Sequence, residues 1–354
     1  MENTAVSKNV KNPYISAVKL IAAIFIVFIH VKFPGVFGNL TECAGRFAVS
    51  YFFAVSGYYS YRAVSSRLIK RLKKTAILLI ISDIIYLGWG LFINCLAGNQ
   101  SPGEYLSSLF SIKDAALFLF ADLRTGHYTF HLWYLTAQIK VYLALYLWLR
   151  FTNNRFSYKP LYYAAFSAFT LSLGLGSIFP IIAGFNTDLP ITSNSLCTGL
   201  PMFMYGIFIH NYEKELTSRF QLTGTKLFIL LITGFVLSFT EFLGIGKTEI
   251  PLGMILTVVA LVLGLTGFTP VPSHEQKIKI VIPDEIDTTS LIIYIIHPLF
   301  FYIAISFPVF QPVTQNGWLF PPFVLICSVL TALIYCLIKR AVKKLSVQNR
   351  AAQH

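Results

Sequence analysis

The chain has 354 residues, of which 55% are hydrophobic and only 12% are charged, and its net charge is +13. About a quarter of the residues in a soluble globular domain are charged, so this composition excludes an ordinary soluble fold. The Lys and Arg residues lie in short segments between long apolar runs rather than on one module, which argues against nucleic acid as a partner.

Ten apolar runs follow one another, each about as long as the hydrocarbon core of a bilayer is thick. We predict an all-α integral membrane protein, a bundle of about ten transmembrane helices, because a helix satisfies its own backbone hydrogen bonds in lipid. A further stretch, Tyr105 to Phe120, favours a helix in the membrane interface. The predicted spans are 14–33, 45–63, 75–97, 129–149, 160–182, 196–212, 225–243, 250–269, 288–309 and 318–340.

Basic residues are unevenly distributed between these runs. With a cytosolic N-terminus, every cytosolic segment is basic, and this bias predicts that both termini lie in the cytosol. We therefore expect a multi-pass protein of the cytoplasmic membrane with a cytosolic segment 1–13, one membrane domain 14–340 and a cytosolic basic tail 341–354. The outer segments carry only Lys32, Arg46, Lys113, Arg124 and Lys247.

Ionisable residues inside spans are costly, and they mark function or an internal polar pair. His30 lies near the outer end of the first span, and imidazole suits proton transfer near neutral pH, so we assign it as a catalytic base. The alternative is an interfacial histidine that anchors the helix end. Lys19 lies three turns earlier on the same face, about 16 Å away. It either binds substrate or extends to the cytosolic surface, and Asp83 is a candidate partner.

The second span opens with Arg46 at the outer membrane edge and closes with Ser56 and Gly57, small residues that allow close helix packing. Arg46 is expected at about the depth of His30, where a guanidinium can stabilise an oxyanion. Contact with lipid headgroups is the alternative for Arg46. The basic run that follows this span indicates topology and anionic-lipid contact. The same run is also a candidate site for the phosphates of a cytosolic donor, held by Arg67, Lys70 and Arg71.

Two more regions hold histidines. His127 and His131 are four residues apart and would share one face of a helix. No third ligand is fixed nearby, so we predict no metal site. His297 lies midway along the ninth span, next to Pro298, which opens the helical hydrogen-bond ladder there. A structural and a functional role for His297 are therefore both open.

Several short motifs run in order along nearly the whole chain. They are Lys19 followed by ten residues and His30; Arg46 with Phe52-Phe53 and Ser56-Gly57-Tyr58; His131-Leu132-Trp133-Tyr134-Leu135; Leu200-Pro201-Met202-Phe203 with Gly206; and Ile293-Tyr294-Ile295-Ile296-His297. With these motifs the chain resembles the membrane-bound acyltransferase-3 family. The resemblance implies a ten-helix core with cytosolic termini that acylates sugars and other envelope molecules. The chain also resembles the membrane domain of vancomycin-resistance serine racemases.

The chain departs from this family pattern at two positions. Lys19 stands where the family usually has arginine, and Ser16 stands where an acidic residue is frequent. Lysine keeps the positive charge, but it lacks the planar fork with which arginine grips a carboxylate or phosphate. The resemblance therefore leaves open whether Lys19 can do the work of that arginine.

Together these features predict an integral membrane O-acyltransferase. It would move an acyl group, acetyl in the first instance, from a cytosolic acyl-CoA-type donor to a hydroxyl of an envelope carbohydrate or related acceptor. We expect no bound cofactor, with acyl-CoA as co-substrate, and as partners the lipid bilayer, the acyl donor and an envelope glycan. The oligomeric state stays open. The assigned residues are His30 and Arg46 for catalysis, Lys19, His131, Trp133, His297 and Ser56 for substrate binding, and Arg67, Lys70 and Arg71 for donor phosphates.

The alternative function is a transporter or permease for a small polar solute such as an amino acid. The same buried charges would then line a passage. Transporters often contain inverted repeats and broken helices. No repeat is recognisable here, and Gly174, Gly176 and Pro180 interrupt only the fifth span, so the sequence favours the enzyme.

Overall fold

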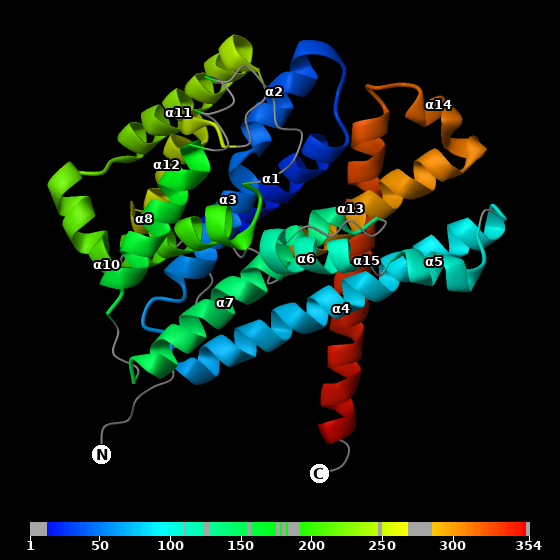
Figure 1. The fold of residues 1–354 in the computed structure, drawn as a ribbon, viewed down its shortest axis with the longest axis horizontal. Helices are drawn as coiled ribbons and strands as arrows, with labels where there is room; N and C mark the ends of the chain where they lie inside the picture. Colours follow the sequence, from blue (N-terminus) through cyan, green and yellow to red (C-terminus); the bar gives the residue numbers. More distant parts are fainter. Residues whose placement is uncertain are drawn as a thin grey trace.

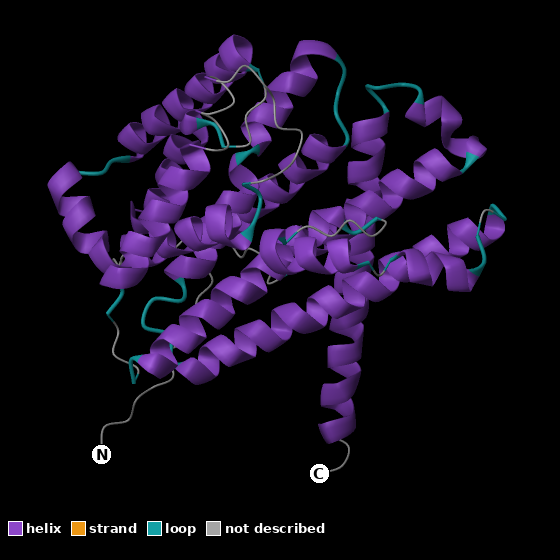
Figure 2. Ribbon diagram, viewed as in Figure 1, coloured by secondary structure: helices purple, strands orange, loops and turns teal. Residues whose placement is uncertain are grey.

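The protein is described from a computed structural model, which covers residues 13–98, 100–109, 111–122, 128–153, 157–174, 178, 182, 192–246, 250–267 and 285–351. The described residues form helices, turns and loops, and none of them forms a strand (Figure 2). The all-α prediction is therefore confirmed for this part of the chain.

Five helices are long and apolar enough to cross a membrane, and they coincide with the first, third, seventh, ninth and tenth predicted spans. A further helix, α12 (Leu252–Gly267), is apolar but shorter. The described residues thus form a helical membrane protein, while the count of ten spans and the orientation stay predictions. The five helices are α1 (Pro13–His30), α4 (Ser65–Leu96), α11 (Gly224–Ile245), α13 (Ile286–Ser306) and α15 (Phe320–Ala351).

The other predicted spans also contain helices, although these differ from the expected lengths. The second span corresponds to α3 (Phe47–Tyr58), whose 12 residues are only about 18 Å long, because the chain just before it forms a separate helix, α2 (Gly35–Gly45). The fifth corresponds to α8 (Lys159–Leu173), and much of the remaining predicted span lies outside the described residues. The fourth and sixth correspond to α7 (Trp133–Phe151) and α10 (Leu200–Phe220).

The stretch predicted as one interfacial helix is two helices, α5 (Pro102–Ser108) and α6 (Ile112–Ala121). Ser111 breaks it, because its side chain accepts the backbone N–H of Asp114 and so begins a new helix. Ser101 and Glu104 form a capping box at the start of α5. The two hydrogen bonds from Ser101 hold the pKa of the Glu104 carboxyl below its usual value.

The helices pack in antiparallel and crossing pairs. Figure 1 shows α4 beside α7, and α11 beside α12, while α1 packs on α13 and α13 on α15. The closest crossing is between α3 and α10, where a Cβ atom on Gly57 would lie 1.8 Å from the Phe203 carbonyl oxygen. Gly206 meets the Ala54 carbonyl in the same way. The prediction that small residues at the end of the second span allow close helix packing is therefore confirmed at Gly57.

Short helices gather at one side of the molecule. In Figure 1, α2 and α14 (Gln311–Thr314) lie toward the top and α5 at the right, whereas the start of α4 lies at the lower left and the connection from α10 to α11 at the left. These two groups are the segments predicted to be outer and cytosolic, respectively. The last helix, α15, continues to Ala351 rather than ending near residue 340, and its final turns project from the bundle (Figure 1).

Candidate functional site

Three histidines from distant segments meet inside the bundle. His30 ends α1, His131 lies in a 3-10 turn, η1 (Phe130–Leu132), and His297 lies in α13. The rings of His30 and His297 are stacked, with centroids 5.2 Å apart and an interplanar angle of 27°. The His131 ring meets His297 edge-on at 5.7 Å. The structure therefore brings together all three histidines that were predicted to carry function, and we call them the histidine cluster.

The three rings differ in accessibility. The side chains of His297 and His131 are sealed in the bundle, with 0% and 2% exposure, whereas His30 is half-buried. The exposed Phe130 ring meets the His30 ring edge to face, with centroids 5.3 Å apart. Of the histidine cluster, His30 is the ring that an incoming molecule can reach.

The position of His297 next to Pro298 determines which nitrogen of its ring carries the proton. Proline has no N–H, so the carbonyl of Tyr294, four residues earlier, has no helical donor. The Nδ1 atom of His297 lies 3.0 Å from that carbonyl oxygen and 3.1 Å from the carbonyl oxygen of Ile293. Since carbonyls only accept, Nδ1 carries the hydrogen. Nε2 then holds a lone pair, and no described group lies in hydrogen-bond reach of it.

Two tyrosines that the sequence reasoning missed hold His131. Tyr86 of α4 donates its hydroxyl to the Ile295 carbonyl at 2.6 Å, and its ring lies 4.9 Å from His131. Nε2 of His131 lies 3.3 Å from the same carbonyl oxygen, and the Tyr294 hydroxyl donates to the His131 carbonyl. Tyr294 lies in the motif Ile293 to His297, and that motif could have indicated a role for it. Tyr86 carried no sequence signal beyond a hydroxyl in an apolar run.

A row of polar side chains continues from the histidine cluster along one face of α7. The Tyr134 ring lies 5.7 Å from Tyr294, and the hydroxyls of Tyr134 and Tyr142 both approach Ser56 of α3. Between these two tyrosines on the same face is Gln138, which is 3% exposed. Its amide oxygen and nitrogen have no hydrogen-bond partner among the described residues.

Trp133 borders this row of polar side chains rather than the histidine cluster. It is the first residue of α7, and its ring lies 6.3 Å from that of Phe53 on α3. The predicted substrate-binding residues Trp133 and Ser56 therefore lie on two helices, α7 and α3, whose aromatic side chains are in contact.

Lys19 lies at the other end of α1 and is paired with a different carboxylate from the one expected. Its Nζ atom is 3.3 Å from Asp287 in the first turn of α13, rather than paired with Asp83. The Ser16 hydroxyl also donates to Asp287, at 3.4 Å. Asp287 of α13 thus bonds both Ser16 and Lys19 of α1.

Arg46 is paired with an acidic residue of α2. Its guanidinium donates to Glu42 at 2.7 Å, and Lys32 bonds the other oxygen of the same carboxylate at 2.6 Å. The Glu42 side chain is only 4% exposed. Arg46 also borders a small cavity with Ser238 and Phe242 of α11. Arg46, which lies between α2 and α3, is thus next to α11.

The predicted donor-binding residues lie in the first two turns of α4. Arg71 donates to the Ser60 hydroxyl at 2.6 Å and to the Tyr59 carbonyl at 2.9 Å, which fixes the start of α4 to the end of α3. Arg67 and Lys70 are exposed in the first two turns. A helix N-terminus favours anions, so these two cations and the helix dipole act in the same direction.

Within the described residues, no three His, Cys, Asp or Glu side chains come together as a metal site. His127, the other member of the predicted histidine pair, lies outside the described residues. In the histidine cluster, His30 stacks on His297 and His131 meets His297 edge-on.

The fold and site define a helical membrane protein with a buried histidine cluster and a cationic helix start. A family model described as an acyltransferase domain matches residues 12–339. The chain belongs to this acyltransferase family, as predicted from its motifs, and this membership supports a membrane acyltransferase. An amino-acid racemase from Enterococcus faecalis is 24% identical over 357 residues, covering 92% of this chain and 46% of the relative, so the chain spans less than half the length of that protein. No solved structure matches.

Proposed function

We propose that the protein is a membrane O-acyltransferase that moves an acyl group, most simply acetyl, from an acyl-CoA-type donor on the cytosolic side to a hydroxyl of an envelope carbohydrate. The observation that carries this proposal is the histidine cluster, in which one ring is accessible and two are sealed. Family membership supports acyl transfer as the reaction class. The donor, the acyl group and the acceptor are our inference from the site.

In the proposed reaction, His30 accepts the proton of the acceptor hydroxyl as its oxygen attacks the thioester carbonyl. A carbon–oxygen bond forms, the carbon–sulfur bond breaks, and the proton leaves with the thiolate as a free thiol. A well-placed base typically contributes a factor of about 10²–10⁴. His297 positions His30 by ring stacking, and its own orientation is fixed by the carbonyls that Pro298 leaves open.

The donor would be held at the opposite end of the bundle. Arg67 and Lys70, exposed at the N-terminus of α4, would bind its phosphates. The acyl-bearing arm would follow the polar row on α7 toward the histidine cluster. Gln138 supports this route because a buried amide with no partner is costly, and an amide-containing arm would supply both a donor and an acceptor.

Lys19 and Arg46 take supporting roles in this proposal. The Lys19–Asp287 pair would hold α1 against α13, so that His30 and His297 stay in contact at the other end of the same two helices. Arg46 and Lys32 share the single carboxylate of Glu42, which leaves one positive charge in excess. This group would attract an anionic part of the acceptor rather than the oxyanion at His30.

The proposal is tested by mass spectrometry of envelope glycans from cells with and without the protein. A lost acyl group in its absence is expected, together with thioester consumption by the purified protein when that glycan is added. Unchanged glycans and no release of free thiol would contradict the proposal. A His30→Ala variant, expected to insert normally, serves as the matched control in both measurements.

A second candidate is a permease for an amino acid. It is favoured by one observation, the relative named an amino-acid racemase, which matches nearly the whole chain at low identity. The same purified protein separates the candidates. A permease reconstituted in liposomes should take up labelled amino acid and consume no thioester, whereas the acyltransferase should release free thiol and show no uptake.

A further inference from the structure

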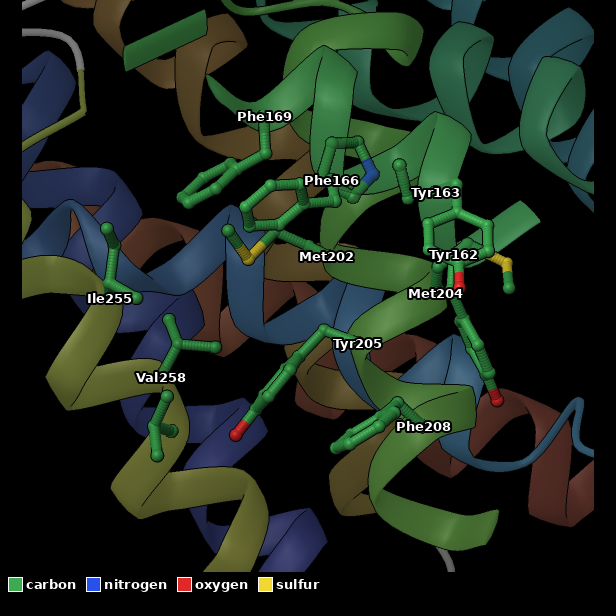
Figure 3. A pocket seen from close by; sticks show the side chains of 13 residues that line it. Tyr162, Tyr163, Phe166, Phe169, Met202, Met204, Tyr205, Phe208, Ile255 and Val258 are labelled. Carbon is green, nitrogen blue, oxygen red and sulfur yellow. The ribbon is translucent and has the colours of Figure 1, made fainter. Parts of the chain in front are cut away.

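A slot lies between α8 and α12. Both helices pack on α10, which forms the floor. The slot is a cavity of about 500 Å³, within the range of small-molecule sites. Figure 3 shows Phe166 and Phe169 of α8 facing Ile255 and Val258 of α12, with Tyr205 of α10 between them. Its lining is almost entirely hydrocarbon and aromatic.

The slot is open to the membrane side rather than sealed. Tyr163 and Phe166 line it and are 73% and 71% exposed. A polar atom lies deep inside, because the Tyr205 hydroxyl is buried and has no hydrogen-bond partner among the described residues. Figure 3 shows this hydroxyl pointing toward Val258. An occupant is therefore expected to be mostly apolar, to enter from the bilayer and to offer an acceptor such as an ester carbonyl.

A positive charge stands at one end of the slot. Lys159 is the first residue of α8, and it is exposed. Residues four and seven positions later on a helix lie on the same face, so Lys159 shares a face with Tyr163 and Phe166. The N-terminus of α8 adds its partial positive charge. Tyr162, which also lines the slot, is in ring contact with Tyr158 just before α8. The end of the slot near Lys159 is thus complementary to an anion.

We propose that this slot binds one acyl chain of an anionic phospholipid, with the phosphate at Lys159 and an ester carbonyl accepting the Tyr205 hydroxyl. The open apolar walls account for the chain, and the cation accounts for the headgroup. Lys159 stands at the predicted cytosolic end of α8, so the headgroup belongs to the inner leaflet. It is a binding site separate from the histidine cluster.

The proposal is tested by native mass spectrometry of delipidated protein in detergent, to which each phospholipid is added in turn. We expect one molecule of dioleoyl phosphatidylglycerol to remain bound under activation that removes other lipids, and dioleoyl phosphatidylcholine to bind at least tenfold more weakly. Val259→Trp fills the slot and should reduce phosphatidylglycerol binding at least tenfold. Val236→Trp, the same change on an exposed site of α11, should leave it unchanged.

Two further variants test the polar contacts. Lys159→Gln should lower phosphatidylglycerol binding to the phosphatidylcholine level without altering the latter, while Lys343→Gln on the exposed end of α15 should have no effect. Tyr205→Phe keeps the ring and should weaken both lipids about two- to tenfold, the value of one hydrogen bond.

The outcomes separate the possible occupants. Equal retention of the two phospholipids would overturn the anionic headgroup, and normal lipid binding by Val259→Trp would overturn the slot itself. A monodisperse wild-type dimer that becomes monomeric in Val259→Trp would show that a second copy of the chain covers this face, which also refutes the proposal. Circular dichroism and size-exclusion profiles identify any variant that fails to fold, and the two lysine variants then decide the result.

Discussion

Replacement of His30 is expected to remove acyl transfer while leaving the bundle assembled. The base it supplies corresponds to about 10²–10⁴ in rate, or about 2.7–5.4 kcal/mol in the activation barrier. The folding cost is smaller. The His30 ring makes contacts with His297 at 5.2 Å and Phe130 at 5.3 Å, each worth about 0.5–1.5 kcal/mol. Alanine should therefore lower stability by about 1–3 kcal/mol.

Phenylalanine at position 30 separates these two effects. It keeps a ring against His297 and Phe130, but it cannot accept a proton. We expect His30→Phe to be nearly as stable as the wild type, and yet to lose at least a hundredfold in rate. Phe130→Ala is the matched control, because it removes ring contacts with His30 and His131 and no base, and it should keep at least a tenth of the activity.

The assay follows free thiol released from acetyl-CoA by purified protein in nanodiscs, with the acceptor glycan supplied, alongside thermal unfolding of each variant. A His30→Phe enzyme that retains more than a tenth of the wild-type rate would refute the role of His30 as base. Loss of activity in Phe130→Ala equal to that in His30→Phe would show that the ring contacts, rather than proton transfer, determine the rate.

Three other predictions follow from the same contacts. Lys19→Met should lower stability by about 1 kcal/mol, the upper value for a partly exposed ion pair, while Lys19→Arg should restore it because arginine can still reach Asp287; equal unfolding temperatures would contradict this. Pro298→Ala should raise the unfolding temperature and lower activity about tenfold, because the new N–H competes with His297 for the Tyr294 carbonyl; unchanged activity would contradict the fixed tautomer. Gln138→Leu should raise KM about tenfold for acetyl-CoA but not for a simple alkyl thioester without amides; an equal change for both would exclude contact with the donor arm.

His30 could be predicted from the sequence, because an imidazole in an apolar run is costly in a membrane and therefore indicates function. His131 and His297 were assigned through the motifs that contain them, and the three rings meet in the structure. What the sequence could not supply is the set of backbone carbonyls that orient them. Those contacts depend on how α13 opens at Pro298 and how α4 packs against it.

The errors concern the direction in which a side chain faces rather than its end of the bundle. Asp83 was expected to pair with Lys19 at the inner end, but the neighbour of α1 there is α13, which supplies Asp287, and only tertiary packing decides this. Arg46 was expected at about the depth of His30, where it would stabilise an oxyanion. In the structure its guanidinium bonds Glu42 of α2, and Arg46 borders a small cavity with α11. A hydropathy pattern gives the order of spans, but it does not give their rotation.

The arrangement of hydrogen bonds around His297 is the strongest structural argument that this histidine serves chemistry. A purely structural histidine in a sealed apolar site would be expected to satisfy both ring nitrogens, because a buried polar atom without a partner costs about 1–3 kcal/mol. Here Nδ1 has two carbonyls, yet Nε2 has no partner among the described residues on a side chain with 0% exposure. The stacked ring beside it is the accessible His30. The fold therefore maintains a fixed, unsatisfied lone pair beside the ring that a substrate can reach, which costs stability and is useful in proton transfer.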